Sequence, residues 1–362
     1  MRALALAALL AACAAPPPAV VTPTPTPHAG VLKVTALLDL SGRGARVGTD
    51  QREAIQRWVD ARPASAPRMS VRVVDTAGSD ATLFVELRRA AVEERSDALL
   101  VGVPVQYDDT LGRAVDLAGM PVLFLEPLRR DPVAEVGGRW AFALAPALED
   151  LAAAEVADAL ARDLLAPSVV LVDGGLALDP MAAALAAAVA RSGHDPIREV
   201  AVAVDGTVPG VVRSNVPLLA SVHCLARLPA CRSIAEAAAS SGATTLVYLP
   251  YRVTATELAG ASELAARAVF PRWRASGPRP SWIASVHSAV AADALSLLSA
   301  AAAESPPGDH DALRATMERI TMTLIATTYS FTPGRHGISE PDLTFTRWTG
   351  ADVGPVIPTA SP

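Results

Sequence analysis

The chain has 362 residues, which is long for one small domain and predicts two domains of ordinary size. Hydrophobic residues make up 51% of the sequence, and this content excludes global disorder. The net charge of −6 and the aromatic content of 4% argue against nucleic-acid binding, which needs a basic surface and stacking side chains. We therefore expect no nucleic-acid partner.

The first 13 residues have the pattern of an export signal. Arg2 supplies a basic start, and residues 3–12 form an apolar segment that is too short for a transmembrane helix. Residues 10–13 read LAAC and are similar to the bacterial lipobox, in which Cys13 would be lipidated and become the mature N-terminus. An ordinary secretory signal is the alternative.

A tether follows the signal. Residues 14–30 are rich in proline and threonine, which favours an extended chain without a core. The residue after Cys13 is Ala14, which favours the outer membrane if the cell is Gram-negative. We expect contact with the membrane through the lipid anchor only.

Residues 31–48 predict a buried strand, a polar turn and the start of a helix. The strand is almost continuously apolar, as in parallel sheets that are covered on both faces. The turn contains Ser41 and Gly42, and Asp50 and Glu53 have the spacing of a capping box that opens a helix over 51–59. Because ligands bind at the carboxyl edge of a parallel sheet, we expect this turn to form one wall of a ligand cleft.

Strand and helix patterns then alternate in two series. The first series predicts strands at 69–75, 98–103, 122–125 and 140–144 and helices at 81–94 and 110–118. The second series predicts helices at 149–165, 180–192 and 230–241 and strands at 169–172, 199–204, 218–224 and 244–249. Helices at 262–275, 285–303 and 311–320 and a β-hairpin over 327–350 complete the chain. Two such series, separated near residue 145, predict an α/β fold with two doubly wound lobes.

Six short segments, in this order along the chain, carry a family resemblance. They are Leu40-Ser41-Gly42 with Gly48, residues 75–80, residues 101–103 with 120–122, residues 140–146 (WAFALAP), Ala292-Asp293-Ala294 with Leu297-Leu298, and residues 329–348. Together they resemble the type I periplasmic solute-binding proteins of ABC transporters, in particular the leucine/isoleucine/valine-binding branch. The resemblance covers nearly all of residues 31–355.

The resemblance implies two lobes joined by a multi-strand hinge. Lobe 1 would comprise residues 31–143 and 255–324, and lobe 2 residues 144–254 and 325–357. Ligand binding between the lobes would stabilise a closed form.

The loops that would hold the ligand differ from those of the amino-acid-binding members. Residues 104–107 replace the serines and threonines of the family, Glu126 replaces a serine, and Tyr251 falls where the acidic partner of the ligand ammonium would lie. A carboxylate that faced Glu126 would be repelled unless Arg129 or Arg130 compensated, which argues against a simple branched-chain amino acid. We expect the ligand to contact Ser41, Arg43, Gln106, Tyr107, Glu126, Asp179 and Tyr251.

Two cysteines lie close together in the second series. Cys224 and Cys231 flank a strand end and a helix start, and in an exported protein they predict a disulfide that stabilises by about 2–3 kcal/mol. The alternative is a metal site with His223, which lacks a fourth ligand at a suitable spacing.

No catalytic motif is present in the sequence: it lacks a G-x-S-x-G elbow, a Walker A sequence, an H-E-x-x-H pair and a strand followed by G-x-G-x-x-G. We expect no enzyme activity, catalytic residue, cofactor or metal. The predicted function is that of an envelope-anchored periplasmic lipoprotein, which captures a small polar ligand such as an amino acid or a related compound for an ABC importer and its permease. The alternatives are a degenerate member that acts through protein contacts in the cell envelope, for example in cell-wall regulation, and a hydrolase on the same scaffold.

Overall fold

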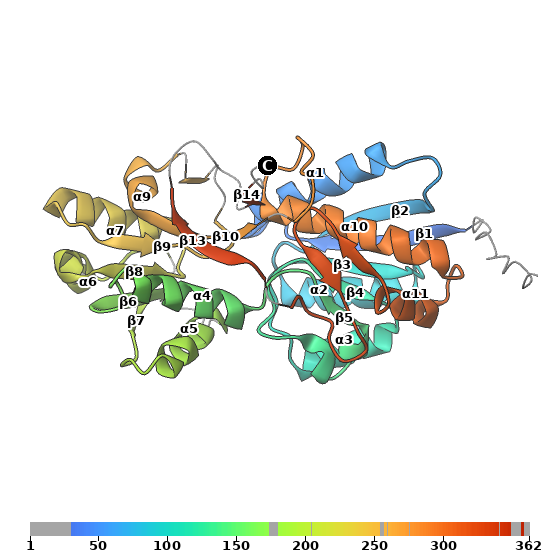
Figure 1. Ribbon diagram of the computed structural model, residues 1–362, viewed down its shortest axis with the longest axis horizontal. Coiled ribbons are helices and arrows are strands. Elements are labelled where there is room, and N and C mark those ends of the chain that lie inside the picture. The colour runs from blue at the N-terminus through green and yellow to red at the C-terminus, as the bar shows by residue number, and fades with distance from the viewer. Residues whose placement is uncertain are drawn as a thin grey trace, which may run out of the picture.

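Two α/β lobes lie side by side along the longest axis of the molecule (Figure 1). The structure is a computed structural model, and it describes residues 30–173, 180–203, 205–253, 257–258, 260–274, 276–339, 341–348 and 356–357. The expected export signal with Cys13, the tether up to residue 29 and Asp179 lie outside the described residues.

A five-stranded parallel sheet forms the centre of lobe 1. Its strand order is β2 (Arg68–Asp75), β1 (Val31–Leu38), β3 (Ala98–Gly102), β4 (Val122–Phe124) and β5 (Ala141–Ala143). The helices of this lobe are α1 (Ala45–Ala61), α2 (Asp80–Val92), α3 (Asp109–Ala118), α10 (Val286–Glu304) and α11 (His310–Met317), with the short 3₁₀ turns η1 (Pro132–Ala134) and η2 (Gly138–Trp140).

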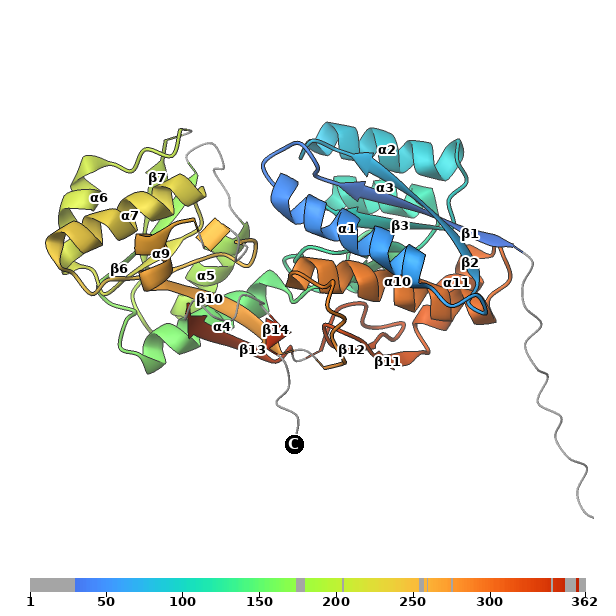
Figure 2. The same cartoon turned by 90° about the horizontal axis from the view of Figure 1, so that it is seen from above.

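The helices of lobe 1 cover both faces of its sheet. Successive residues of a strand point to opposite faces, so Leu38 packs into one core with α1 and α10 whereas Leu37 packs into the other with α2 and α3. The two pairs of helices accordingly lie on opposite sides of the sheet (Figure 2). Helix α10 is long and apolar enough to span a membrane. However, 72% of its apolar stretch is buried inside the protein, as expected for a core helix.

A second, seven-stranded sheet forms the centre of lobe 2. Its order is β13 (Leu343–Arg347), β10 (Ala268–Arg274), β9 (Leu246–Tyr248), β8 (Ser221–Cys224), β6 (Ser168–Asp173) and β7 (Arg198–Val202), and β14 (Val356–Ile357) also pairs with β10. Its helices include α4 (Leu148–Ala161), α5 (Pro180–Arg191), α6 (Gly210–Asn215), α7 (Leu228–Ser241) and α9 (Ser262–Arg267), and the 3₁₀ turn η3 (Val216–Leu218) precedes β8. The expected architecture of two doubly wound α/β lobes is confirmed.

The first helix begins earlier than its expected start at residue 51. Helix α1 starts at Ala45 after Gly44, so the capping box of Asp50 and Glu53 is wrong, and Asp50 lies buried inside the helix. The reason is a close approach between the helix and the end of β1. A Cβ atom on Gly48 would lie 2.0 Å from the backbone oxygen of Asp39, so only glycine allows this contact.

The expected helix over 262–275 and the lobe boundary drawn around it are also corrected. Helix α9 ends at Arg267, and the chain continues as β10, because Pro271 cannot lie in a helix interior. Strand β10 pairs with β9 and β13, so residues 255–324 do not all belong to lobe 1. Conversely, β11 (Thr321–Thr323) and β12 (Thr328–Ser330) pair with each other, and Tyr329 packs into the core of lobe 1.

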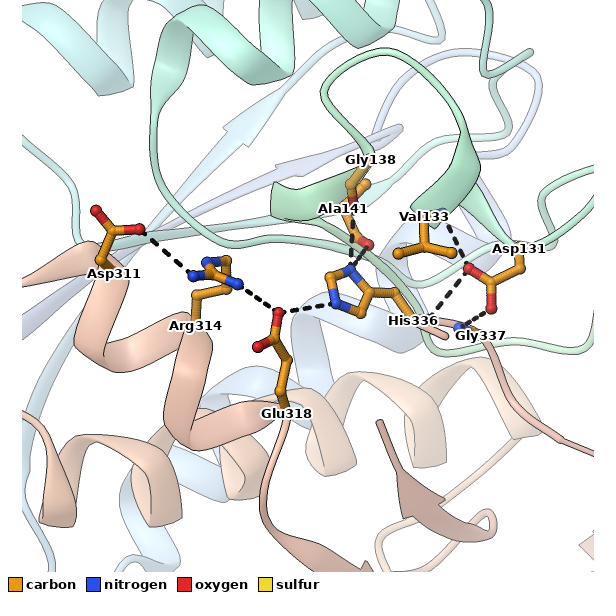
Figure 3. A network of polar contacts seen from close by, with 9 residues as sticks. All are labelled: Asp131, Val133, Gly138, Ala141, Asp311, Arg314, Glu318, His336 and Gly337. Atoms are coloured by element: carbon orange, nitrogen blue, oxygen red, sulfur yellow. Dashed lines mark hydrogen bonds and ion pairs between the residues drawn. The ribbon is translucent and has the colours of Figure 1, made fainter. Parts of the chain in front are cut away.

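The tail does not form the expected hairpin over 327–350. Strand β12 pairs with β11 and β13 pairs with β10, so the two halves of the tail join different sheets. Asp131 of lobe 1 diverts the chain, because its carboxylate accepts the N–H groups of His336 (3.1 Å) and Gly337 (2.8 Å). The buried His336 ring fixes the segment further through Glu318, which also pairs with Arg314 (Figure 3).

A disulfide joins Cys224 and Cys231 in the core of lobe 2, with a sulfur–sulfur distance of 2.08 Å. Both sulfurs are therefore committed to each other rather than to a metal. The neighbouring His223 is buried, and its Nδ1 lies 2.6 Å from Glu155 Oε1 on α4.

Candidate ligand cleft

Polar loops from the two lobes meet at the carboxyl ends of their parallel strands. The loop after β1 carries Arg43, which pairs with Asp173 at the end of β6. The loop after β9 carries Arg252, whose Nε lies 3.7 Å from Oε2 of Glu126, the second residue after β4. Each ion pair joins one lobe to the other, and this edge is where ligands bind in open parallel sheets.

The loop after β1 is shaped by a buried carboxylate. Asp39 is 2% exposed, and its two oxygens accept the N–H groups of Gly42 (2.7 Å) and Gly44 (2.6 Å). The backbone N–H of Leu40, the first residue after Asp39, donates to Asp75 Oδ1 at 2.9 Å. Ser41 is exposed, and the hydrogen bond from its side chain lowers the pKa of Asp75. The N–H groups of Leu40, Gly42 and Gly44 are therefore satisfied by two acids, Asp39 of this loop and Asp75 at the end of the neighbouring strand β2.

Glu126 lies at the centre of a second polar group. Its side chain is 2% exposed, and Oε1 accepts hydrogen bonds from Gln51 Nε2 on α1 and His287 Nδ1 on α10, each at 2.9 Å. Oε2 receives no hydrogen bond from the residues that the structure describes. The carboxylate is thus fixed through one oxygen, and the other faces Arg252.

Tyr251 and Arg252 bring lobe 2 against this group. The Tyr251 ring meets the His287 ring edge to face at 5.0 Å, and its hydroxyl has no hydrogen-bond partner among the described residues. Burial, and then the charge of Glu126, raise the pKa of Tyr251 well above its usual value. The Arg252 guanidinium lies over the start of α1. Its Nη2 is so close to Gly44 that a Cβ atom on this glycine would lie only 2.3 Å from it.

Asp173 is the corresponding acid of lobe 2, and it is fully engaged. Besides its pair with Arg43, Asp173 Oδ1 accepts the backbone N–H of Arg227 at 3.2 Å, and the Arg227 Nε lies 3.5 Å from Oδ2. One carboxylate is therefore shared by two guanidinium groups.

Comparison with solved structures finds the same fold over nearly the whole chain. A possible leucine/isoleucine/valine-binding protein from Rhodopirellula baltica SH 1 has a TM-score of 0.72 and 14% identity, over 91% of this chain and 96% of the other. A solute-binding protein of an ABC transporter from R. palustris, in complex with benzoate, has a TM-score of 0.71 and 14% identity over 90% and 95%. A periplasmic binding protein type 1 from Bordetella pertussis Tohama I has a TM-score of 0.69 and 14% identity over 90% and 99%.

The chain has the type I periplasmic-binding-protein fold. The resemblance carried by the six short segments is thereby confirmed for the fold. No protein-family model matches the sequence. A search of curated proteins also finds no match.

Several expected ligand residues of this periplasmic-binding fold lie around the facing strand ends. Arg43, Glu126 and Tyr251 take part in the contacts that join the lobes or lie directly beside them, and Ser41 belongs to the loop after β1. These positions share one property: each follows the carboxyl end of a strand.

Two other expected residues, Gln106 and Tyr107, follow β3 but take no part in these ion pairs. Tyr107 packs edge to face on Phe124 at 5.5 Å and donates to the backbone oxygen of Val136, and burial raises its pKa. Gln106 is exposed, and no described contact joins it to Glu126. The arginines expected to offset Glu126 pair with other acids, Arg129 with Glu149 and Arg130 with Glu135.

The sequence interpretation did not identify Gln51, His287 and Arg252. A signal for Gln51 was present, because it lies one helical turn from Val47 and from Ile55 on the buried face of α1, where a polar side chain needs a partner. His287 is 1% exposed, and its acidic partner Glu126 lies 161 residues away in the sequence, so the local sequence gives no signal for the pair. Nothing in the local sequence distinguishes Arg252 from the other arginines.

Proposed function

We propose that this protein is an extracytoplasmic solute-binding component, which captures a small polar ligand between its lobes and presents it to the permease of an ABC importer. The observation that carries the proposal is the meeting of charged side chains from both lobes at the facing strand ends, Arg252 against Glu126 and Arg43 against Asp173. A ligand seated there would contact both lobes and so favour one interlobe arrangement over others. The role is binding, not catalysis.

The cellular context belongs to the same proposal. Export through the first 13 residues, lipidation of Cys13 and the proline-rich tether would hold the lobes at the surface of a membrane in the periplasm, with the outer membrane favoured in a Gram-negative cell. Mass spectrometry of the membrane fraction should find a diacylated N-terminal peptide that begins at Cys13. A Cys13→Ala variant should lose this peptide and leave the membrane.

A ligand screen tests the binding role. The purified protein is melted in the presence of amino acids, amides and small organic acids, and hits are examined by small-angle scattering. The proposal expects a raised melting temperature together with a smaller radius of gyration. A broad library without a single stabilising compound would count against it.

One observation favours a second candidate. The two ion pairs join the lobes through the protein's own side chains, as expected if the lobe arrangement serves a protein partner in the cell envelope instead of a solute. In that case the scattering profile stays the same with every compound, and breaking both pairs by Arg43→Ala and Arg252→Ala changes it.

A further inference from the structure

Glu126 carries one buried carboxylate oxygen, Oε2, that accepts no hydrogen bond from the described residues. The residue is 2% exposed, and both of its close hydrogen bonds end on Oε1. Oε2 has Arg252 Nε at 3.7 Å, which is too long for a hydrogen bond, and no donor within the described part of the chain. A buried charged acceptor without a donor raises the free energy of the folded protein. A ligand that donates to Oε2 would therefore bind with the full free energy of a charge-assisted hydrogen bond.

The surrounding wall of lobe 1 offers acceptors and few donors. The N–H groups of Leu40, Gly42 and Gly44 are already taken up by Asp75 and Asp39. A ligand carboxylate at this wall would therefore meet the charge of Glu126 without the backbone donors that would offset it. A cation with several N–H groups fits the same wall.

A cation from the protein itself already lies against this wall. The Arg252 guanidinium reaches over from lobe 2, lies beside Gly44 and faces Glu126 Oε2. It is 35% exposed and extends from the loop that follows β9, so it can turn toward solvent without repacking a core. The other acid of the cleft, Asp173, does not offer such a place, because two guanidinium groups and a backbone N–H already engage it.

We propose that the cleft binds a ligand whose guanidinium or ammonium group displaces Arg252 and donates to Oε2 of Glu126. Gln51 and His287 hold the carboxylate in position through Oε1, and the edge of the site is formed by Tyr251, whose hydroxyl has no partner among the described residues. This inference rests on the proposed function and gives the chemical class of its ligand: a compound with a cationic nitrogen, not a simple carboxylate.

Calorimetric titration with agmatine tests the inference, with benzoate as the carboxylate probe. Agmatine should bind the parent protein, and Glu126→Gln should weaken that binding by about 10- to 150-fold, the factor that corresponds to a charge-assisted hydrogen bond. Arg252→Ala should strengthen agmatine binding, because the competing guanidinium is gone and more of the protein is competent to bind. Glu304→Gln and Arg319→Ala are matched controls, since they remove the same charges from an exposed pair at the opposite end of α10 from His287 and should leave the affinity unchanged.

Several results would overturn the inference. They are equal agmatine affinity in the parent and Glu126→Gln, weaker or unchanged agmatine binding in Arg252→Ala, or no agmatine binding to either the parent or Arg252→Ala. If Glu126→Gln does not fold, as judged by circular dichroism, the agmatine affinity of Arg252→Ala alone tests the inference, because Arg252 is half-exposed and its replacement leaves the core intact. Binding of benzoate with no binding of agmatine would refute the cationic ligand and leave the solute-binding role standing.

Discussion

The stability of lobe 1 should depend on the protonation of Asp293. This residue lies inside α10 with no exposed surface, and its two oxygens accept the N–H groups of Ile325 (3.0 Å) and Ala326 (2.8 Å). Burial raises its pKa from 3.8 to about 7, although these N–H groups and Tyr329 lower it in part. Burial therefore outweighs three hydrogen bonds to the charged form.

The direction of the pH effect follows from the raised pKa. Between pH 3.8 and about 7 the folded protein holds a proton on Asp293 that the unfolded chain has released, so the free energy of unfolding falls as the pH rises. With these two pKa values the loss between pH 5 and pH 7.5 is about 2.5 kcal/mol, and it levels off above pH 7.5. The contribution is thus largest in acid and disappears near neutrality.

Urea unfolding of the parent and Asp293→Asn at several pH values between 5 and 8 measures this effect. The amide cannot ionise, so the difference in unfolding free energy between the two proteins should change by about 2.5 kcal/mol across the range, whatever the constant cost of the lost acceptor. Asp109→Asn is the control, because that carboxylate is exposed on α3. Parallel pH curves for the parent and Asp293→Asn would refute the reasoning.

Three further variants test the packing. Gly48→Ala should lower the free energy of unfolding by about 1–3 kcal/mol, because the new methyl group meets a backbone oxygen, and an unchanged urea midpoint would contradict the close approach. Replacing Cys224 and Cys231 by alanine should lower the free energy of unfolding by about 2 kcal/mol, as expected for a loop with a separation of 7 residues. A reductant should lower the stability of the parent to that of the variant. No response of the parent to the reductant would speak against the disulfide. Glu318→Gln should cost about 3 kcal/mol, since it leaves the buried His336 without its acid; equal midpoints would mean that the network in Figure 3 adds no stability.

The fold could be predicted from the sequence because its signals are local and repeated. Apolar strands such as Val31–Leu38 and glycine-terminated helices such as Asp109–Ala118 can be recognised from the pattern of a few neighbouring residues. The errors occurred where distant contacts decide the outcome. The tail changes direction because Asp131, about 200 residues earlier, holds the backbone of His336. Such a partner has no signal in the local sequence.

The Ala292-Asp293-Ala294 motif shows the same limit. As a family resemblance it helped to predict the fold, but the sequence gives no reason for an acid in the middle of an apolar helix. The structure supplies that reason, because Asp293 binds two consecutive N–H groups of residues 325 and 326, next to strands β11 and β12. The residue therefore anchors the segment that follows α11.

The chemistry of the cleft was partly predictable for a related reason. Glu126 and Tyr251 could be assigned to the cleft because each follows a strand, whereas Gln51 and Arg252 could not be paired with Glu126 before the lobes were assembled. The prediction that Glu126 would repel a carboxylate gains weight from this assembly, since the arginines expected to compensate are paired with other acids. The compensating cation instead comes from the opposite lobe. A buried acid on one lobe that faces a displaceable arginine on the other is a reason to test cationic solutes before branched-chain amino acids.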